Sequence, residues 1–308
     1  MEITKQKDIN SYILKKNNLL PVIQFPRYLM LQTISFCNGK CIICPYTEVH
    51  NKFNQGLMHY TLLKKIIKEC KKQQELSFIG FTLQNEPLLD TRLLKFIQFI
   101  KNELPDVGIS LVTNGILLSS ELSKKLILNG LDEICISLHG VTEKTYTKIS
   151  PGHSSDQVIQ NVITFFKLNE QYNGNVKISV SIVKNKINHH EILRNKIFWK
   201  RYKIESNTYP LSNRIGCLNN FDDLISDNMD VYHFFQECII PFQTLSILYN
   251  GDVLLCCQDW GRENIVGNLY NQSIKEIWQN EKMNNIRNEL LKKSGKNILP
   301  CSKCLSAK

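Results

Sequence analysis

Short apolar runs recur between residues 28 and 215, and longer amphipathic stretches separate them. Alternation of apolar and polar residues predicts strands, which we place at 28–36, 76–84, 108–115, 133–140, 176–185 and 203–211. Apolar positions with helical spacing predict helices between the strands, as at 59–73 and 93–104. Because a parallel strand can return only through a crossover, this order predicts an α/β domain with a parallel sheet.

A different pattern follows the last of these strands. Residues 218–237 lose the alternation, and we interpret them as a linker with a short helix. Two β-type runs in residues 238–260 are joined by Asn250-Gly251, which favours a hairpin turn, and an amphipathic helix is expected over 273–293, capped by Ser273. We therefore divide the chain into an N-terminal extension (1–27), the α/β domain (28–217), the linker and a small domain (238–308).

Composition narrows the class of protein. The sequence has 308 residues, no evident signal peptide and no apolar run of the ~18 residues that cross a bilayer, so we expect a cytoplasmic protein without a membrane partner. Eleven cysteines in such a chain favour metal binding over disulfides. The net charge of +10 fits an acidic partner, or simply a solvated lysine-rich surface.

Three of the cysteines form a C-x3-C-x2-C triplet at the end of the first predicted strand, namely Cys37, Cys41 and Cys44. Catalytic residues in such sheets lie at the carboxyl ends of strands. Three thiolates can hold three irons of a four-iron cluster and leave the fourth iron open. A structural zinc site normally needs four ligands in pairs, so the triplet favours the cluster.

This spacing resembles that of the radical S-adenosylmethionine (radical SAM) superfamily, which implies a partial (β/α)6 TIM-like barrel. It also implies a [4Fe-4S] cluster on the triplet, with S-adenosylmethionine (AdoMet) on the open iron and cleavage of AdoMet to a 5′-deoxyadenosyl radical. Gln84-Asn85-Glu86-Pro87 stands where the family has Gly-Gly-Glu-Pro, with both glycines replaced. The residues that the resemblance assigns to cofactor binding are Ile43, Gln84, Asn85, Glu86, Thr113, Asn114 and Ser137.

A second set of cysteines lies in the small domain: Cys238, Cys256, Cys301 and Cys304. From their spacing alone, four thiolates from a hairpin and a terminal C-x2-C suit a zinc ribbon as well as a second cluster. The surrounding pattern is similar to the SPASM/Twitch extension of radical SAM enzymes, in its shorter Twitch form. That resemblance implies one auxiliary [4Fe-4S] cluster on these four residues.

Two further residues are candidates for catalysis. Arg214 lies in a Ser-Asn-Arg-x-Gly segment that resembles one in aminocyclitol dehydrogenases of the family, where the arginine faces the substrate; otherwise it is a surface residue of a linker. Cys257 adjoins Cys256 and could give a hydrogen atom to a substrate radical, or have no role. Cys70 and Cys135 are expected to be small core residues, and His139 follows Ser137 at a strand end.

The function predicted from these patterns is modification of a ribosomally synthesised peptide by epimerisation, crosslinking or oxidation during natural-product maturation. Oxidation or epimerisation of a sugar or aminocyclitol is the alternative, and the partners would include a one-electron reductant such as flavodoxin or ferredoxin. A zinc-containing nucleic-acid-binding protein is permitted by the charge, but it leaves Glu86, the Thr-Asn-Gly turn and the barrel pattern without a purpose. A tRNA-modifying radical enzyme is a nearer alternative, although no additional RNA-binding domain is evident.

Overall fold

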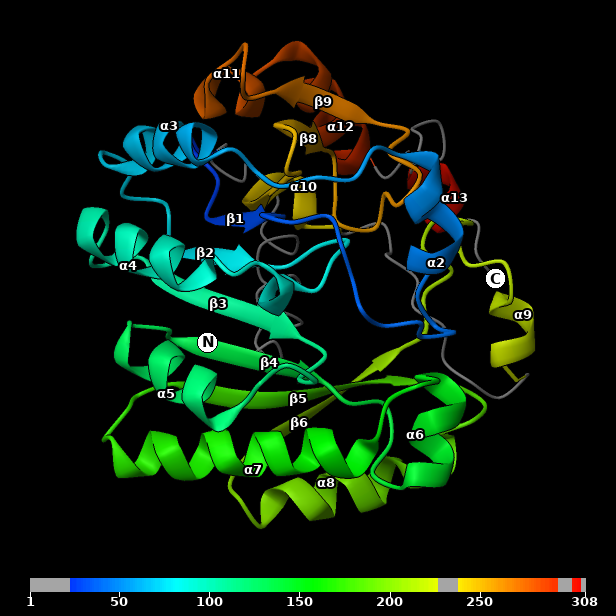
Figure 1. Cartoon of the computed structure of the whole chain (residues 1–308). Helices are drawn as coiled ribbons and strands as arrows, with labels where there is room; N and C mark the ends of the chain where they lie inside the picture. Colours follow the sequence, from blue (N-terminus) through cyan, green and yellow to red (C-terminus); the bar gives the residue numbers. More distant parts are fainter. Residues whose placement is uncertain (1–22, 227–237, 293–300, 306–308) are drawn as a thin grey trace.

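The computed structural model describes residues 23–226, 238–292 and 301–305. It confirms a parallel sheet in which the first six strands lie side by side in sequence order (Figure 1). These strands are β1 (Tyr28–Leu31), β2 (Phe78–Phe81), β3 (Gly108–Thr113), β4 (Glu133–Ser137), β5 (Lys177–Lys184) and β6 (Glu205–Pro210). Each is shorter than the apolar run that predicts it, because the residues after the strand turn into the loops that form the site.

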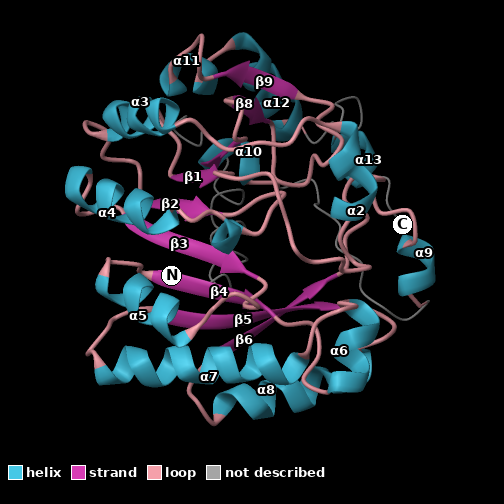
Figure 2. Cartoon of the chain, in the orientation of Figure 1, coloured by secondary structure: helices cyan, strands magenta, loops and turns pink. Residues whose placement is uncertain are grey.

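Helices between the strands cover the outer face of this sheet, while short helices gather at the carboxyl ends of the strands (Figure 2). The covering helices are α3 (Tyr60–Cys70), α4 (Leu93–Glu103), α5 (Ser120–Leu128), α7 (Ser155–Gln171) and α8 (Ile192–Lys200). The short ones are α2 (Tyr46–Val49), α6 (Glu143–Ile149), α9 (Phe221–Leu224) and α13 (Cys301–Leu305). The arrangement is a partial barrel, open between its edges.

The two faces of β4 show how alternation builds this barrel. Ile134 and Ile136 point outward into the main hydrophobic core, beneath the covering helices. Cys135, between them, points into the barrel lumen, where it interacts with Ser179 and Ser181. The expectation that Cys135 is a core residue was therefore wrong, because a strand alternates its faces, whereas the expectation for Cys70 on α3 is confirmed.

The C-terminal segment continues the barrel sheet. Strand β7 (Thr244–Ile247) pairs in parallel with β1, and β8 (Asp252–Leu254) and β9 (Ile265–Asn268) add antiparallel strands beyond it. The predicted hairpin turn at Asn250-Gly251 is confirmed, and Gly251 has the positive φ (82°) that such a turn requires. The small domain is thus joined to the barrel through backbone hydrogen bonds.

The helix expected over 273–293 is instead two helices, α11 (Ile274–Trp278) and α12 (Glu281–Leu291). Ser273 caps α11, as predicted, and forms a capping box with Glu276, while Asn280 caps α12 by accepting from the Met283 amide. An asparagine that bonds the backbone in this way starts a new helix and ends the previous one.

Some expectations fall outside the described residues. Most of the N-terminal extension and residues 227–237 of the linker belong there, while the short helix expected in the linker is α9. Within the described ranges, the helices are all too short or too polar to cross a bilayer.

Candidate active site

A cavity of about 620 Å³ opens at the carboxyl ends of the parallel strands and extends down the lumen. It is lined by residues of the cysteine loop after β1, of strands β3 to β6, of the loops after β2, β3, β4 and β8, and of the turn after β6. Glu133, Lys177 and Glu205 line its far end, at the amino ends of β4, β5 and β6. Most sequence-predicted site residues meet in this one space.

The three cysteines of the triplet line the cavity together. Cys37 Sγ accepts a hydrogen bond from the Gly39 amide (3.3 Å), and the Cys37 amide donates to the Tyr46 hydroxyl (2.9 Å). Burial raises the pKa of Cys37 to about 12 and that of Cys44 to about 11, and the neighbouring cysteines contribute to both shifts. Thiols held this way become thiolates only beside strong positive charge, which iron provides.

Gly39 provides a test of whether this loop fits a cluster. A Cβ added there would lie 3.5 Å from Cys37 Sγ and 3.6 Å from Cys41 Sγ, so the missing side chain leaves the space between two of the sulfurs free. A loop that keeps open space among its thiols fits a bound iron-sulfur cluster.

The second set of cysteines also comes together. Cys238 precedes α10 (Ile240–Gln243) and interacts electrostatically with Cys301 and Cys304 of α13. Cys256, which follows β8, interacts in the same way with Cys238 and Cys301. Burial raises the pKa of Cys238 to about 12 and that of Cys301 to about 11. In the described ranges, no three His, Cys, Asp or Glu side chains form a site for a single metal ion.

Glu86 connects the ends of β2 and β3. Its carboxylate accepts hydrogen bonds from the Leu88 amide (3.0 Å), the Thr113 hydroxyl (2.7 Å) and the Asn114 amide (2.7 Å). Burial raises the pKa of Glu86, and these three donors counter that shift. Asn114 Nδ2 also donates to Asn38 Oδ1 (2.8 Å), so the Thr-Asn-Gly turn fixes both Glu86 and the cysteine loop.

The two residues before Glu86 have different contacts. Asn85 lines the cavity, and both atoms of its buried amide lack a hydrogen-bond partner among the described residues, which fits polar groups of a bound cofactor. The Gln84 amide instead donates to the Asp259 carbonyl (3.1 Å) and accepts from the Arg262 guanidinium (3.3 Å). Gln84 therefore joins this loop to the C-terminal segment.

Arg214 is held in the cavity wall by a strained turn. Arg214 and Ile215 both have positive φ (52° and 60°), a conformation that costs about 1–3 kcal/mol per residue and is found mainly at functional sites. Its Nη1 donates to Gln258 Oε1 (3.0 Å), and its buried Nε has no partner in the described part of the chain. The Arg214 charge opposes the burial that raises the pKa of Cys257 and Cys44.

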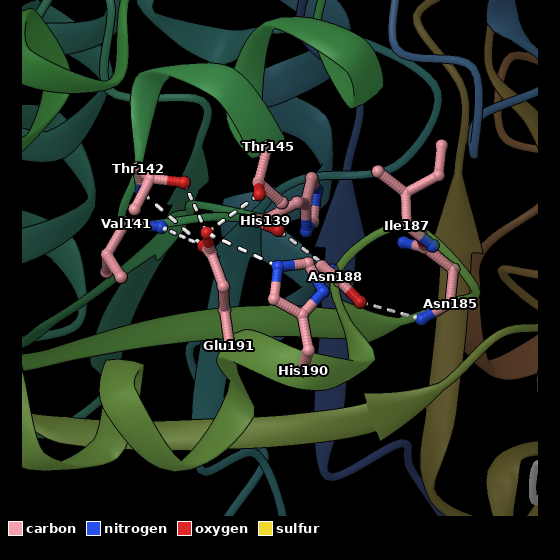
Figure 3. A network of polar contacts seen from close by, with 9 residues as sticks. All are labelled: His139, Val141, Thr142, Thr145, Asn185, Ile187, Asn188, His190 and Glu191. Carbon is pink, nitrogen blue, oxygen red and sulfur yellow. Dashed lines mark hydrogen bonds and ion pairs between the residues drawn. The ribbon is translucent and has the colours of Figure 1, made fainter.

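His139 shares this wall with Arg214. Its Nδ1 accepts a hydrogen bond from the Val183 amide (3.3 Å), which assigns the proton of the neutral ring to Nε2. Burial, and then the Arg214 charge, lower the pKa of His139 to about 4, so the imidazole is neutral near pH 7. The Asn188 side chain donates to the His139 carbonyl (2.8 Å), as Figure 3 shows.

The loop that follows His139 is fixed by a buried carboxylate, Glu191 (Figure 3). It accepts hydrogen bonds from the Val141 amide, from the Thr142 amide and hydroxyl, and from the Thr145 hydroxyl. Burial alone would raise the pKa of Glu191, but these donors outweigh it and lower the pKa. The loops after β4 and β5 therefore form one rigid rim of the cavity.

Sequence reasoning missed several residues of the cavity wall. Tyr46, Gln258 and Trp260 line it, and the buried Trp260 Nε1 has no partner among the described residues. Their adjacency to Cys44 and Cys257 was the only signal in the sequence. Ile43, predicted for cofactor binding, lines the cavity and packs in a small apolar cluster with Ile149 and Leu211. Ser137 lines the cavity as well.

Family profiles agree with this geometry. Residues 31–195 match the Radical SAM superfamily, and residues 238–305 match the SPASM family, an iron-sulfur cluster-binding domain. The first match covers more than half of the chain, so the protein belongs to the radical SAM superfamily. It is an enzyme that uses a [4Fe-4S] cluster and AdoMet, and its SPASM domain implies auxiliary iron-sulfur binding.

Individual relatives resemble the chain along most of its length. The AdoMet-dependent 2-deoxy-scyllo-inosamine dehydrogenase of Niallia circulans is 24% identical over 272 residues, 88% of this chain and 89% of the relative. The crystal structure of BtrN with AdoMet and 2-DOIA has a TM-score of 0.57 at 21% identity and covers 87% of each chain. That of Streptococcus suis SuiB bound to the precursor peptide SuiA has a TM-score of 0.68 at 16% identity, covering 92% of this chain and 71% of SuiB.

Proposed function

We propose that this enzyme modifies a ribosomally synthesised peptide, using Cys37, Cys41 and Cys44 as ligands of the radical cluster and Cys238, Cys256, Cys301 and Cys304 as ligands of one auxiliary cluster. The main support is that one cavity gathers the triplet, the Asn85-Glu86 pair, Arg214 and Cys257. When bound there, the cluster and AdoMet would supply a 5′-deoxyadenosyl radical that abstracts a hydrogen atom.

The protein's own groups would orient the reactants and exclude water. Glu86 offers a buried carboxylate, already fixed by three donors, to the ammonium of AdoMet, and Asn85 has an unused amide beside it. Arg214 would hold the substrate against the opposite wall. Cys257 would give its thiol hydrogen to the substrate radical and then regain one electron and one proton, the electron coming from a reductant such as flavodoxin or ferredoxin.

The shape of the cavity favours an extended substrate. It is lined along the whole of β4, from Ser137 near the cysteine loop to Glu133 at the other end, and four residues of a strand span about 13 Å. Ser110, Ser179 and Ser181 bring small polar side chains into this lumen, beside apolar residues such as Met30 and Val112, whereas closed barrels fill it with branched apolar residues. A peptide segment fits such a passage better than a single ring, and the charge of +10 suits an acidic precursor.

A sugar or aminocyclitol is the second candidate. The similarity to 2-deoxy-scyllo-inosamine dehydrogenase over 88% of the chain favours it, as does the Ser212-Asn213-Arg214 turn.

For either substrate, mass spectrometry distinguishes oxidation or crosslinking from epimerisation. Oxidation or crosslinking removes two hydrogen atoms from the substrate, whereas epimerisation in D2O keeps their number and replaces one carbon-bound hydrogen with deuterium from the exchangeable thiol.

The proposal is tested by incubating the reconstituted enzyme with AdoMet, a strong reductant and candidate substrates of both classes under anaerobic conditions. A modified peptide together with 5′-deoxyadenosine supports the peptide assignment. A modified cyclitol with unchanged peptides would replace it with the second candidate.

Substitution of Cys257 separates radical formation from radical quenching. We expect Cys257→Ser to form 5′-deoxyadenosine at a rate within about threefold of wild type and to form no epimerised product, because a hydroxyl gives up its hydrogen atom far less readily than a thiol. Chiral analysis of the hydrolysed product together with quantified 5′-deoxyadenosine is the measurement. Undiminished epimer formation in the variant would exclude Cys257 as the donor.

Arg214 is expected to act on substrate and not on AdoMet. We predict that Arg214→Ala lowers kcat/KM for the substrate about a hundredfold, the equivalent of about 3 kcal/mol, and changes the Kd for AdoMet less than threefold. Gln258→Ala should reproduce part of this loss because Gln258 holds Nη1. Arg194→Ala, a substitution at an exposed residue, serves as the control. Equal activity of both arginine variants would show that Arg214 does not bind substrate.

A further inference from the structure

The loop between α6 and α7 covers one side of the cysteine loop and has no part in the scheme above. The Ile42 amide donates to the Ile149 carbonyl (2.9 Å), and His153 Nε2 donates to the Asn38 carbonyl (3.0 Å). Between these two anchors, Ser150 Oγ lies 3.2 Å from Cys41 Sγ. These two hydrogen bonds hold the loop against the cysteine loop on both sides of the Ser150–Cys41 contact, and neither of them involves the Ser150 hydroxyl.

This contact is buried. Ser150 is 2% exposed. Its amide donates to the Tyr146 carbonyl (2.7 Å), one turn earlier on α6, which fixes the backbone of Ser150 beside Cys41. A buried site strengthens the hydrogen bond that a hydroxyl donates to a charged sulfur.

We propose that Ser150 donates its hydroxyl proton to the Cys41 sulfur and thereby raises the reduction potential of the radical cluster. The inference rests on the proposed ligand set of Cys37, Cys41 and Cys44. Adding an electron to an iron-sulfur cluster increases negative charge on its sulfurs, so a hydrogen-bond donor stabilises the reduced form more than the oxidised form. Ser150 would thus make the cluster easier to reduce.

Ser150 is well suited to this test because its donor can be removed alone. Cys37 Sγ accepts from the Gly39 amide, a backbone donor that side-chain substitution leaves in place. Alanine at position 150 keeps the volume of the serine side chain within one oxygen atom. The contacts of Ile149 and His153 would continue to hold the loop against residues 38–42.

The experiment is a potentiometric titration of the reconstituted full chain followed by EPR, in which the radical cluster is recognised as the signal that AdoMet alters. For Ser150→Ala we expect the equilibrium constant for one-electron reduction of the cluster to fall about tenfold. This corresponds to a shift of the reduction potential by about 59 mV to more negative values. Ser150→Thr, which keeps a hydroxyl, should titrate as wild type. Ser154→Ala is the matched control, because the Ser154 hydroxyl bonds Glu143 in the same loop.

Ser150→Gly provides a second arm in case Ser150→Ala fails to retain its cluster. It removes the same hydroxyl and should shift the potential in the same direction. An unchanged potential in Ser150→Ala, or in Ser150→Gly where only that variant holds a cluster, overturns the inference. A wild-type protein without any AdoMet-sensitive signal would instead overturn the proposed ligand set, and the inference with it.

Discussion

Changing Cys37, Cys41 and Cys44 together to alanine is expected to abolish 5′-deoxyadenosine formation and to lower the iron content from about eight to about four atoms per chain. The reason is that these three cysteines line one cavity, whereas the other four lie near one another before α10, after β8 and on α13. Iron and sulfide analysis after anaerobic reconstitution, combined with chromatography of the AdoMet products, measures both effects.

The control for this variant is Cys70→Ala, since Cys70 is buried in the core on α3 and should affect neither iron content nor AdoMet cleavage. Iron falling from about four atoms to none, with one zinc retained, would show that the C-terminal cysteines bind zinc. That result would remove the auxiliary cluster as an electron acceptor and leave the radical chemistry of the barrel unaffected.

Glu86→Gln is expected to weaken AdoMet binding about a hundredfold, the equivalent of about 3 kcal/mol. The variant removes the negative charge that an ammonium group needs. It also puts an NH2 group in place of Oε1, which accepts from the Leu88 amide and the Thr113 hydroxyl, or of Oε2, which accepts from the Asn114 amide, so at least one buried donor loses its acceptor. Anaerobic equilibrium dialysis with AdoMet provides the Kd.

The exposed Glu121, which pairs with Lys125 on α5, supplies the matched control Glu121→Gln, whose effect on the Kd should be undetectable. Circular dichroism of both variants separates misfolding from lost affinity. A folded Glu86→Gln protein with wild-type affinity for AdoMet would show that Glu86 only connects β2 to β3.

Several features of the site could not be read from the sequence. Gln84 falls within a motif that predicts cofactor contact, yet its amide contacts Asp259 and Arg262, which lie more than 170 residues further along the chain. Ser150 reaches Cys41 across 109 residues. Contacts of this kind depend on how loops meet at the ends of the strands, and the residue types involved are common in any loop.

The sequence alone determined the order of the first six strands and the helices between them, the hairpin turn and both sets of cysteines, because alternation, caps and ligand spacing depend on near neighbours in the chain. The tertiary structure decided that β7 pairs with β1, that Cys135 faces the lumen, and that Arg214, His139 and Cys257 line one cavity with the triplet. These arrangements depend on which strand edges and loop surfaces pack together, and that choice is made only when distant segments bury their surfaces against each other.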